Sequence, residues 1–183
     1  VNPAQVTRPT SDRAREALFS TLESEFGSLS ELKFLDLCAG TGAVGLEALS
    51  RGASKVICVE ENPKAIEVIE KNFSIAFPQL SRNLTPNDKF HIFAQSVDKY
   101  LTQLKNQNGG GEVFDCIFLD PPYELSNEEI FQLIELLAGV LEKRGLLVVE
   151  RASAEKNLTP PSLFGVTKVR KYGSATFIYI EYA

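Results

Sequence analysis

The stretch FLDLCAGTGAVG, residues 34–45, decides the fold of this chain. It opens with a mostly apolar, strand-like run from Phe34 to Cys38, and after Ala39 it reads G-x-G-x-x-G from Gly40 to Gly45. Glycines at this spacing let the backbone turn tightly and approach a ligand, which then faces the N-terminus of the helix that follows. The stretch therefore predicts a strand, a ligand-binding turn and a helix, the opening unit of an α/β fold.

The second strand ends in an acid that suits the same ligand. Glu60 lies 20 residues after Gly40, where a carboxylate can accept hydrogen bonds from the two vicinal hydroxyls of a ribose. The pair predicts a nucleoside-bearing cofactor, either NAD or S-adenosylmethionine. Asp36, inside the first strand, favours S-adenosylmethionine, because a buried carboxylate is costly unless it meets a cation or hydrogen-bond donors. An ammonium group would satisfy Asp36 directly or through water, whereas a pyrophosphate would be repelled.

Asp120-Pro121-Pro122-Tyr123, here called the hook, follows another strand-like run. Each proline fixes one φ angle, lacks an N–H donor and holds the residue before it extended. The hook therefore presents a carboxylate, a backbone carbonyl with no local N–H partner, and an aromatic ring. This set suits a flat group with an amino edge, although a proline-rich turn capped by an aspartate would have the same sequence.

Strand-like and helical segments alternate along the whole chain, which predicts an α/β sheet with helices on both faces. Two C-terminal runs are separated only by residues 172–174, and this short linker indicates antiparallel pairing. We expect one Rossmann-like domain over residues 1–183, with an N-terminal segment and helix in 1–28 and the core sheet in 33–183. The sheet is expected to have seven mostly parallel strands with an antiparallel C-terminal hairpin strand, at about 34–38, 56–60, 90–94, 113–120, 146–150, 164–171 and 175–182.

Three of the expected helices have clear start signals. The first can be capped by Thr10, Ser11 or Asp12, another begins with Asn62 and Pro63, and residues 126–129 form a capping box. The capping box is expected to open a helix with one apolar face, formed by Ile130, Leu133, Ile134, Leu137 and Leu141.

The composition fits one domain without a membrane span. The chain has 183 residues, 44% of them hydrophobic, and neither a membrane-length apolar run nor a signal peptide can be recognised. Three cysteines match no metal or disulfide spacing, which predicts reduced core residues of a cytoplasmic protein and no metal site.

The net charge of -5 gives no overall signature of nucleic-acid binding, so such a partner would have to meet local basic patches. Because the sequence contains no Met, we expect the natural chain to begin upstream of Val1.

Several stretches match a known family. The hook resembles the [D/N]-P-P-[Y/F] motif of S-adenosylmethionine-dependent amino-group methyltransferases. RPTSDRAREALF, residues 8–19, resembles the R-P-T-x-D-R-x-R-E-x-L-F block of the RsmD family, and residues 35–53 resemble its extended cofactor loop. Lys171-Tyr172-Gly173 is similar to the K-x-Y-G block of that family. The resemblance covers nearly the whole chain, and the two long blocks are far more specific than the tetrapeptide.

The resemblance implies a methyltransferase domain that acts on the N2 amino group of a guanine in 16S ribosomal RNA or the small ribosomal subunit. The guanine would leave its stack to enter the pocket. Tyr123 would then stack on it, while Asp120 Oδ and the Pro121 carbonyl accept the two N2 hydrogens. The enzyme is expected to be a cytoplasmic monomer. The expected cofactor residues are Asp36, Ala39, Gly40, Thr41, Gly42, Glu60, Glu61, Ser96, Val97 and Asp120.

Two basic clusters are candidate RNA contacts. Arg8, Arg13 and Arg15 form the first, and Lys168, Arg170 and Lys171 form the second. They can bind phosphates, or they can be solvated faces in which Arg13 and Arg15 pair with neighbouring acids of the first helix.

The chain departs from the family pattern at three places. The short basic β-hairpin that usually precedes the R-P-T block, and that would contribute to RNA contact, is absent. Glu61 replaces an apolar residue that packs on adenine, and Ser96-Val97 replaces an Asp-Ala pair. The Ser96 hydroxyl and the Val97 N–H could still serve the adenine.

Three other functions share some of these features. A DNA adenine-N6 methyltransferase would use the same hook, but it usually needs a target-recognition region for which 183 residues leave little room. A NAD(P)-binding oxidoreductase would share the glycine turn, but it has no obvious use for the hook. A non-catalytic ribosome assembly factor would have no need of an intact Asp120.

Overall fold

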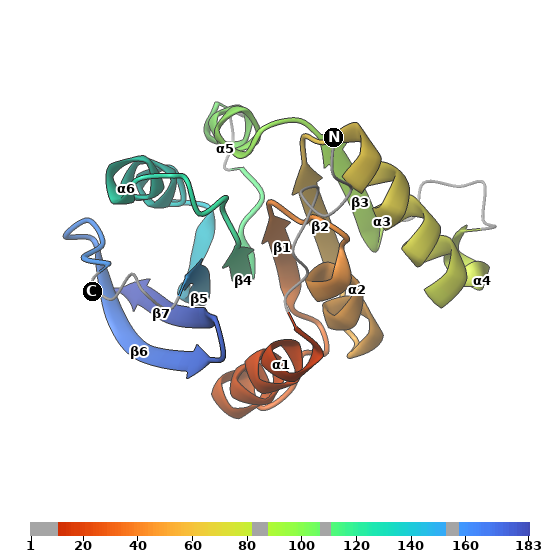
Figure 1. The fold of residues 1–183 in the computed structure, drawn as a ribbon, viewed down its shortest axis with the longest axis horizontal. Coiled ribbons are helices and arrows are strands. Elements are labelled where there is room, and N and C mark those ends of the chain that lie inside the picture. The colour runs from red at the N-terminus through yellow and green to blue at the C-terminus, as the bar shows by residue number, and fades with distance from the viewer. Residues whose placement is uncertain (1–10, 82–87, 107–110, 153–157) are drawn as a thin grey trace.

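The fold is that of a computed structural model, which describes residues 11–81, 88–106, 111–152 and 158–183. Seven strands form one sheet in the order β3-β2-β1-β4-β5-β7-β6 (Figure 1). Strands β1 to β5 pair in parallel, and β7 runs antiparallel to both β5 and β6. The predicted mostly parallel sheet with an antiparallel C-terminal hairpin strand is thus confirmed. The strands are β1 (Lys33–Leu37), β2 (Lys55–Glu60), β3 (Phe90–Ala94), β4 (Phe114–Leu119), β5 (Leu141–Ala152), β6 (Phe164–Tyr172) and β7 (Ala175–Tyr182).

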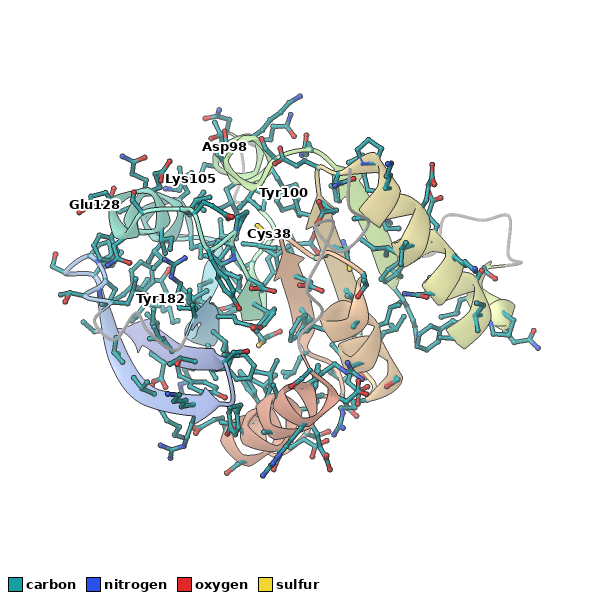
Figure 2. All side chains as sticks on the ribbon, viewed as in Figure 1. Cys38, Asp98, Tyr100, Lys105, Glu128 and Tyr182 are labelled. Carbon is teal, nitrogen blue, oxygen red and sulfur yellow. The ribbon has the colours of Figure 1, made fainter. Side chains whose placement is uncertain are left out.

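Helices cover both faces of the sheet, as Figure 1 shows. Side chains alternate between the faces of a strand, so neighbouring residues such as Phe34 and Leu35 enter different cores. The core with Phe34 packs against α1, α2 and α3, and the core with Leu35 packs against α5 and α6. On the second face Lys105 Nζ of α5 donates to the Glu135 carbonyl of α6 at 3.0 Å. Lys105 is labelled in Figure 2. The helices are α1 (Asp12–Phe26), α2 (Ala43–Ser50), α3 (Pro63–Ala76), α4 (Pro78–Ser81), α5 (Val97–Lys105) and α6 (Asn127–Leu136).

The predicted helix starts are confirmed by their capping hydrogen bonds. Ser11 accepts from the Ala14 N–H at 3.2 Å, and Asn62 accepts from the Lys64 N–H at 3.0 Å. Ser126 forms the predicted capping box with Glu129. These bonds satisfy N–H groups that would otherwise lack partners in the first helical turn.

The expected apolar face of the last helix was wrong at its C-terminal end. Helix α6 ends at Leu136, and Gly139 then adopts a φ of 84°, which redirects the chain. Leu141 is instead the first residue of β5, where it pairs with Phe114. Strand β5 is consequently much longer than the expected run 146–150, and its pairing with β4 shifts register between Phe114 and Cys116.

Within the described ranges, no helix is both long and apolar enough to cross a membrane.

Candidate active site

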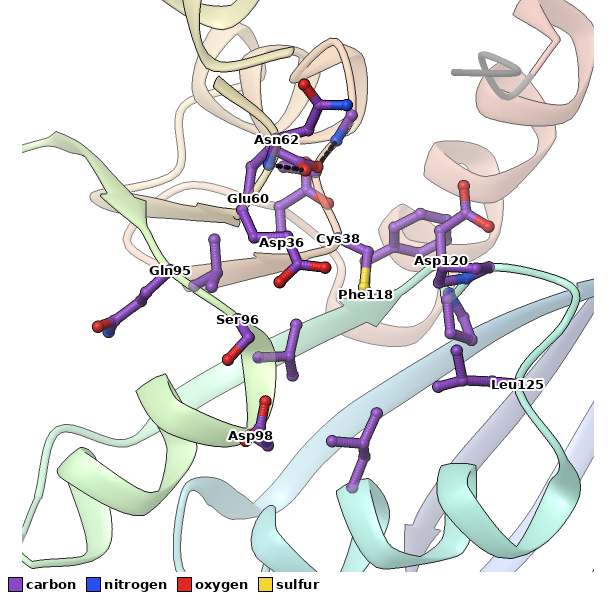
Figure 3. Close-up of a pocket in the computed structure, with 18 of the residues that line it drawn as sticks. Asp36, Cys38, Glu60, Asn62, Gln95, Ser96, Asp98, Phe118, Asp120 and Leu125 are labelled. Atoms are coloured by element: carbon purple, nitrogen blue, oxygen red, sulfur yellow. Dashed lines mark hydrogen bonds between the residues drawn. The ribbon is translucent and has the colours of Figure 1, made fainter. Parts of the chain in front are cut away.

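A cavity of about 790 Å³ lies at the carboxyl ends of the central strands (Figure 3). The connection after β1 leads to β2, whereas the connection after its neighbour β4 leads to β5 in the opposite direction. Ligands of open α/β sheets bind at such a point. The structure brings nearly all the predicted cofactor residues to the wall of this cavity: Asp36, Ala39, Gly40, Thr41, Glu60, Glu61, Ser96, Val97 and Asp120. Gly42 is the exception.

Gly42 shapes the glycine turn from behind the cavity wall. It is the residue before α2, has a φ of 72° and donates its N–H to the Ala39 carbonyl at 2.8 Å. A Cβ at this position would lie 2.9 Å from Cγ2 of Ile69 in α3. The glycine is therefore needed for backbone conformation and close packing, and it does not line the cavity.

Gly45, the last glycine of the motif, allows close packing between α2 and the sheet. A Cβ on Gly45 would lie 2.7 Å from Cys58 Sγ and 3.1 Å from Asp36 Oδ2, so only glycine lets α2 pack this closely on the sheet. Its N–H donates to Asp36 Oδ2 at 2.8 Å. Gly45 thereby fixes the side chain of the acid inside β1.

Asp36 is a buried acid at the floor of the cavity, with 1% of its surface exposed. Burial raises the pKa of its carboxyl to about 7, opposed by the Gly45 hydrogen bond and reinforced by the charge of Glu60. A buried carboxyl with such a pKa is ready to ionise when a cation arrives. The arrangement suits an ammonium group, as expected.

Glu60 supports the glycine turn as well as facing the cavity. Its two oxygens accept hydrogen bonds from the Gly40 N–H at 2.8 Å and the Asn62 N–H at 2.9 Å, which Figure 3 shows as dashed lines. The carboxylate thus joins the glycine turn to the start of α3. Because each carboxylate oxygen can accept more than one hydrogen bond, Glu60 retains acceptor capacity for ribose hydroxyls.

The hook leaves β4 on the other side of the cavity. The Asp120 N–H donates to the Leu37 carbonyl of β1 at 3.2 Å, which places its carboxyl near the end of that strand. Burial, and then the charges of Glu150 and Asp36, raise the pKa of Asp120 well above its ordinary value. Beyond the hook, Arg151 Nη2 donates to the Leu125 carbonyl at 3.1 Å, and this bond anchors the turn to β5.

A second cavity, of about 460 Å³, adjoins the first. Tyr123 lines both cavities and is 36% exposed, so its ring stands at their junction. Glu150, which the sequence analysis missed, is 4% exposed and lines the second cavity with Arg13 and Lys171. Its signal was an acid directly after the apolar residues of a central strand, the same pattern that marked Asp120.

The other predicted RNA contacts lie differently. Arg15 pairs with Asp12 at 2.9 Å and with Glu47 at 3.9 Å, and it does not line the second cavity. Arg8 lies outside the described residues. In the part of the chain that the structure describes, no cluster of three or more His, Cys, Asp or Glu side chains is placed to hold a metal ion.

The comparisons with known proteins agree with this geometry. A family model described as "Conserved hypothetical protein 95" matches residues 1–181. Ribosomal RNA small subunit methyltransferase D of Haemophilus influenzae is 33% identical over 155 residues, covering 84% of this chain and 72% of that protein. The putative rRNA methyltransferase YlbH of Bacillus subtilis is 29% identical over 172 residues, covering 91% and 83%. The solved structure of putative methylase HI0767 from Haemophilus influenzae has a TM-score of 0.72 at 30% identity and covers 95% of this chain and 99% of its own. The chain therefore belongs to the family described as conserved hypothetical protein 95, the RsmD-like methyltransferases.

Proposed function

We propose that this protein transfers the methyl group of S-adenosylmethionine to the N2 amino group of a guanine in 16S ribosomal RNA. The hook at the junction of two cavities is the observation that carries this proposal. On one side lies a cavity with the acids and glycine turn of a nucleoside cofactor site, and on the other a cavity rimmed by Arg13 and Lys171. The names of relatives such as the Haemophilus influenzae small subunit methyltransferase D support ribosomal RNA as the substrate.

The residues of the larger cavity fit S-adenosylmethionine. Asp36 would hold the ammonium group of the methionine moiety, and Glu60 would accept from the ribose hydroxyls. Ser96 and Val97, at the start of α5, would face the adenine, and Glu61 lines the same cavity. When bound, the cofactor supplies a methyl group attached to a positively charged sulfur. An amine can attack the methyl carbon in line and displace the sulfur.

The hook prepares the amine for that displacement. Asp120 Oδ and the Pro121 carbonyl accept the two N2 hydrogens, which directs the nitrogen lone pair towards the cofactor and stabilises the positive charge that develops on nitrogen. Tyr123 holds the face of the base, so that positioning supplies much of the acceleration. N2 gains the methyl carbon as the carbon–sulfur bond breaks, and the surplus proton leaves to the Asp120 carboxylate or to water.

Phosphate contacts would come from the basic rim of the second cavity. Arg13 and Lys171 are exposed there and can meet the RNA backbone. We expect a smaller contribution from Arg15, because its guanidinium already pairs with Asp12 and Glu47. We further propose that the enzyme acts as a monomer in the cytoplasm, and its three free cysteines support a reducing compartment.

Transfer of labelled methyl groups tests the proposed function. The substrates are 16S ribosomal RNA lacking the modification, small-subunit particles assembled from it, and duplex DNA with the same enzyme and cofactor. We expect label in RNA or particles, and mass spectrometry of the digested product should identify N2-methylguanosine. Methyladenine in DNA would instead support the DNA adenine-N6 methyltransferase.

The ring of Tyr123 should matter more than its hydroxyl. Tyr123→Ala removes the stacking surface and is expected to raise KM for RNA by about 10-fold or more, since stacking of a base on an aromatic ring contributes roughly 1–3 kcal/mol. Tyr123→Phe keeps the ring and should have a mild effect. Steady-state kinetics of the two variants checks this, and an inactive Phe variant would show that the hydroxyl is required.

A further inference from the structure

Asp120 directly follows β4, and Glu150 lies near the end of the neighbouring strand β5. In the parallel pairing of β4 with β5, Phe118 lies opposite Val148 and Leu119 opposite Val149, so the next pair along is Asp120 and Glu150. Side chains two residues apart in a strand share a face, and Phe118 and Val148 both enter the core under α1. The charge of Glu150 also raises the pKa of Asp120, in line with this placement.

The second cavity brings Glu150 together with the ring of the hook. Glu150 is 4% exposed, and Tyr123 lines the same cavity. Tyr172, the last residue of β6, lines this cavity too, as do the basic residues Arg13 and Lys171. A flat base stacked on Tyr123 would thus have one buried acid beside the hook and cations towards its phosphates.

The edge of guanine matches two carboxyls in this arrangement. Guanine presents an N1–H donor next to its N2 amino group, whereas adenine has a bare nitrogen acceptor at N1. An ionised carboxylate can only accept hydrogen bonds. With Asp120 and Pro121 occupied by the N2 hydrogens, a neighbouring carboxylate would attract the N1–H of guanine and repel the N1 lone pair of adenine.

We infer that the cavity between Tyr123 and Lys171 is the pocket of the target base, and that Glu150 selects guanine by accepting a hydrogen bond from its N1–H. This inference rests on the proposed function, which names guanine N2 as the methyl acceptor. It assigns a specificity-determining residue that the hook itself cannot supply, because the hook reads only an amino group and a flat face.

A base analogue separates recognition of N1 from methylation of N2. 2-Aminopurine keeps the exocyclic N2 amine but replaces N1–H by a bare acceptor. The experiment measures kcat/KM on RNA carrying guanine or 2-aminopurine at the target position, for the wild type, Glu150→Gln and Glu142→Gln. Glu142 is the matched control, because it lies on the same strand, is exposed and lines neither cavity.

The wild type should prefer guanine by about 100-fold or more, since a site built around a hydrogen bond strongly rejects a ligand that cannot form it. In Glu150→Gln the amide can donate to N1 of 2-aminopurine, so this preference should fall by about 10-fold or more, partly through a gain on the analogue. Glu142→Gln should keep the wild-type preference. The missing O6 of the analogue affects all three enzymes alike and cancels when their preferences are compared.

The possible results distinguish a failure of the proposed role of Glu150 from a failure of the proposed methylation of guanine N2. Equal use of both bases by the wild type, or an unchanged preference in Glu150→Gln, would overturn the role of Glu150 while N2 methylation stands. No transfer to guanine-containing RNA by the wild type would contradict the proposed function, and the inference with it. S-adenosylhomocysteine affinity and thermal melting show whether Glu150→Gln is folded. If it is not, Glu150→Asp, which keeps the carboxylate, and Glu150→Ala, which removes it, are compared in the same way, and an equal guanine preference in these two variants would overturn the role of Glu150.

Discussion

Asp120→Ala is expected to lower the rate of methyl transfer by roughly 10²–10³-fold, because it removes an acceptor aimed at the charge that develops on N2. The affinity for S-adenosylhomocysteine should stay nearly unchanged, since the glycine turn, Asp36 and Glu60 do not depend on this side chain. Single-turnover kinetics and calorimetry measure the two quantities. Near-full turnover by the variant would falsify the catalytic role of Asp120.

Two companion variants sharpen this result. Asp120→Asn keeps an acceptor oxygen, so it should retain considerably more activity than the alanine variant. Glu128→Gln, an exposed acid in the first turn of α6 that lines neither cavity, is the control for loss of a negative charge nearby and should resemble the wild type.

The rate should also depend on pH through Asp120. Its pKa is raised by burial and by the charges of Glu150 and Asp36, so the carboxylate form becomes populated only as pH rises well above the ordinary range of an aspartate. The wild-type rate should therefore rise with pH through the folded-state pKa of this carboxyl, and the corresponding limb should be absent from Asp120→Asn. A pH–rate profile of both enzymes shows whether the limb belongs to Asp120.

Asp36→Asn is expected to weaken S-adenosylhomocysteine binding by about 100-fold, because removing one partner of a buried charge pair is strongly unfavourable. The amide can still accept the Gly45 N–H that Asp36 Oδ2 accepts at 2.8 Å, so the glycine turn should survive. Calorimetry measures the affinity, and circular dichroism shows whether the fold is retained. Unchanged affinity would place the ammonium group elsewhere.

The number of protons released when S-adenosylhomocysteine binds is a second measurement that tests the role of Asp36. The Asp36 carboxyl has a pKa of about 7, so at pH 6 it is mostly protonated, whereas an ammonium partner favours the carboxylate. Binding of S-adenosylhomocysteine at pH 6 should therefore release close to one proton, and affinity should rise with pH and level off above about 7. S-adenosylhomocysteine is chosen because it lacks the sulfonium charge, which would also act on Asp120. Binding enthalpies in two buffers of different ionisation enthalpy reveal the proton, and Asp36→Asn should release none.

The free energy of unfolding of the ligand-free protein should fall as pH rises, whereas the affinity for S-adenosylhomocysteine should rise. The folded-state pKa of Asp36, about 7, lies above the value of 3.8 expected in the unfolded chain. The folded state thus binds more protons between these values, and the free energy of unfolding falls as pH rises from about 4 to 7. Asp120, whose pKa is also raised, contributes to the same decline. Asp36→Asn should therefore make the decline smaller than in the wild type, which urea titrations of both proteins at pH 5 and pH 8 can measure.

The features that could be predicted from sequence are those in which one short segment determines the outcome. The glycine turn, the capping box at Ser126 and the Asn62–Pro63 start each depend on residues within a few positions of one another. Leu141 was misplaced for a related reason. Its spacing continues the helical pattern, but the chain turns at Gly139 and Leu141 then pairs with Phe114 as part of β5. This pairing joins residues far apart in the sequence, so the local pattern does not predict it.

The candidate site shows the same division. Asp36, Glu60 and Asp120 could be predicted because each lies beside a recognisable motif. Glu150 acquires meaning only when β4 and β5 pair and bring it next to Asp120, a contact set by the strand order of the whole sheet. The double use of Glu60, which holds the backbone of Gly40 and Asn62, also depends on three-dimensional proximity.

The position of β7 has a consequence for how the protein acquires its structure. β5 is flanked by β4 on one side and by β7 on the other, yet β7 follows it in the chain only after β6. Until β7 adds in antiparallel fashion, β5 has an unpaired edge whose apolar residues 146–149 could join another chain. Long-range pairing of this kind slows folding and lengthens the period in which aggregation competes. The strand that carries Glu150 therefore also depends on the prompt addition of β7 during biosynthesis.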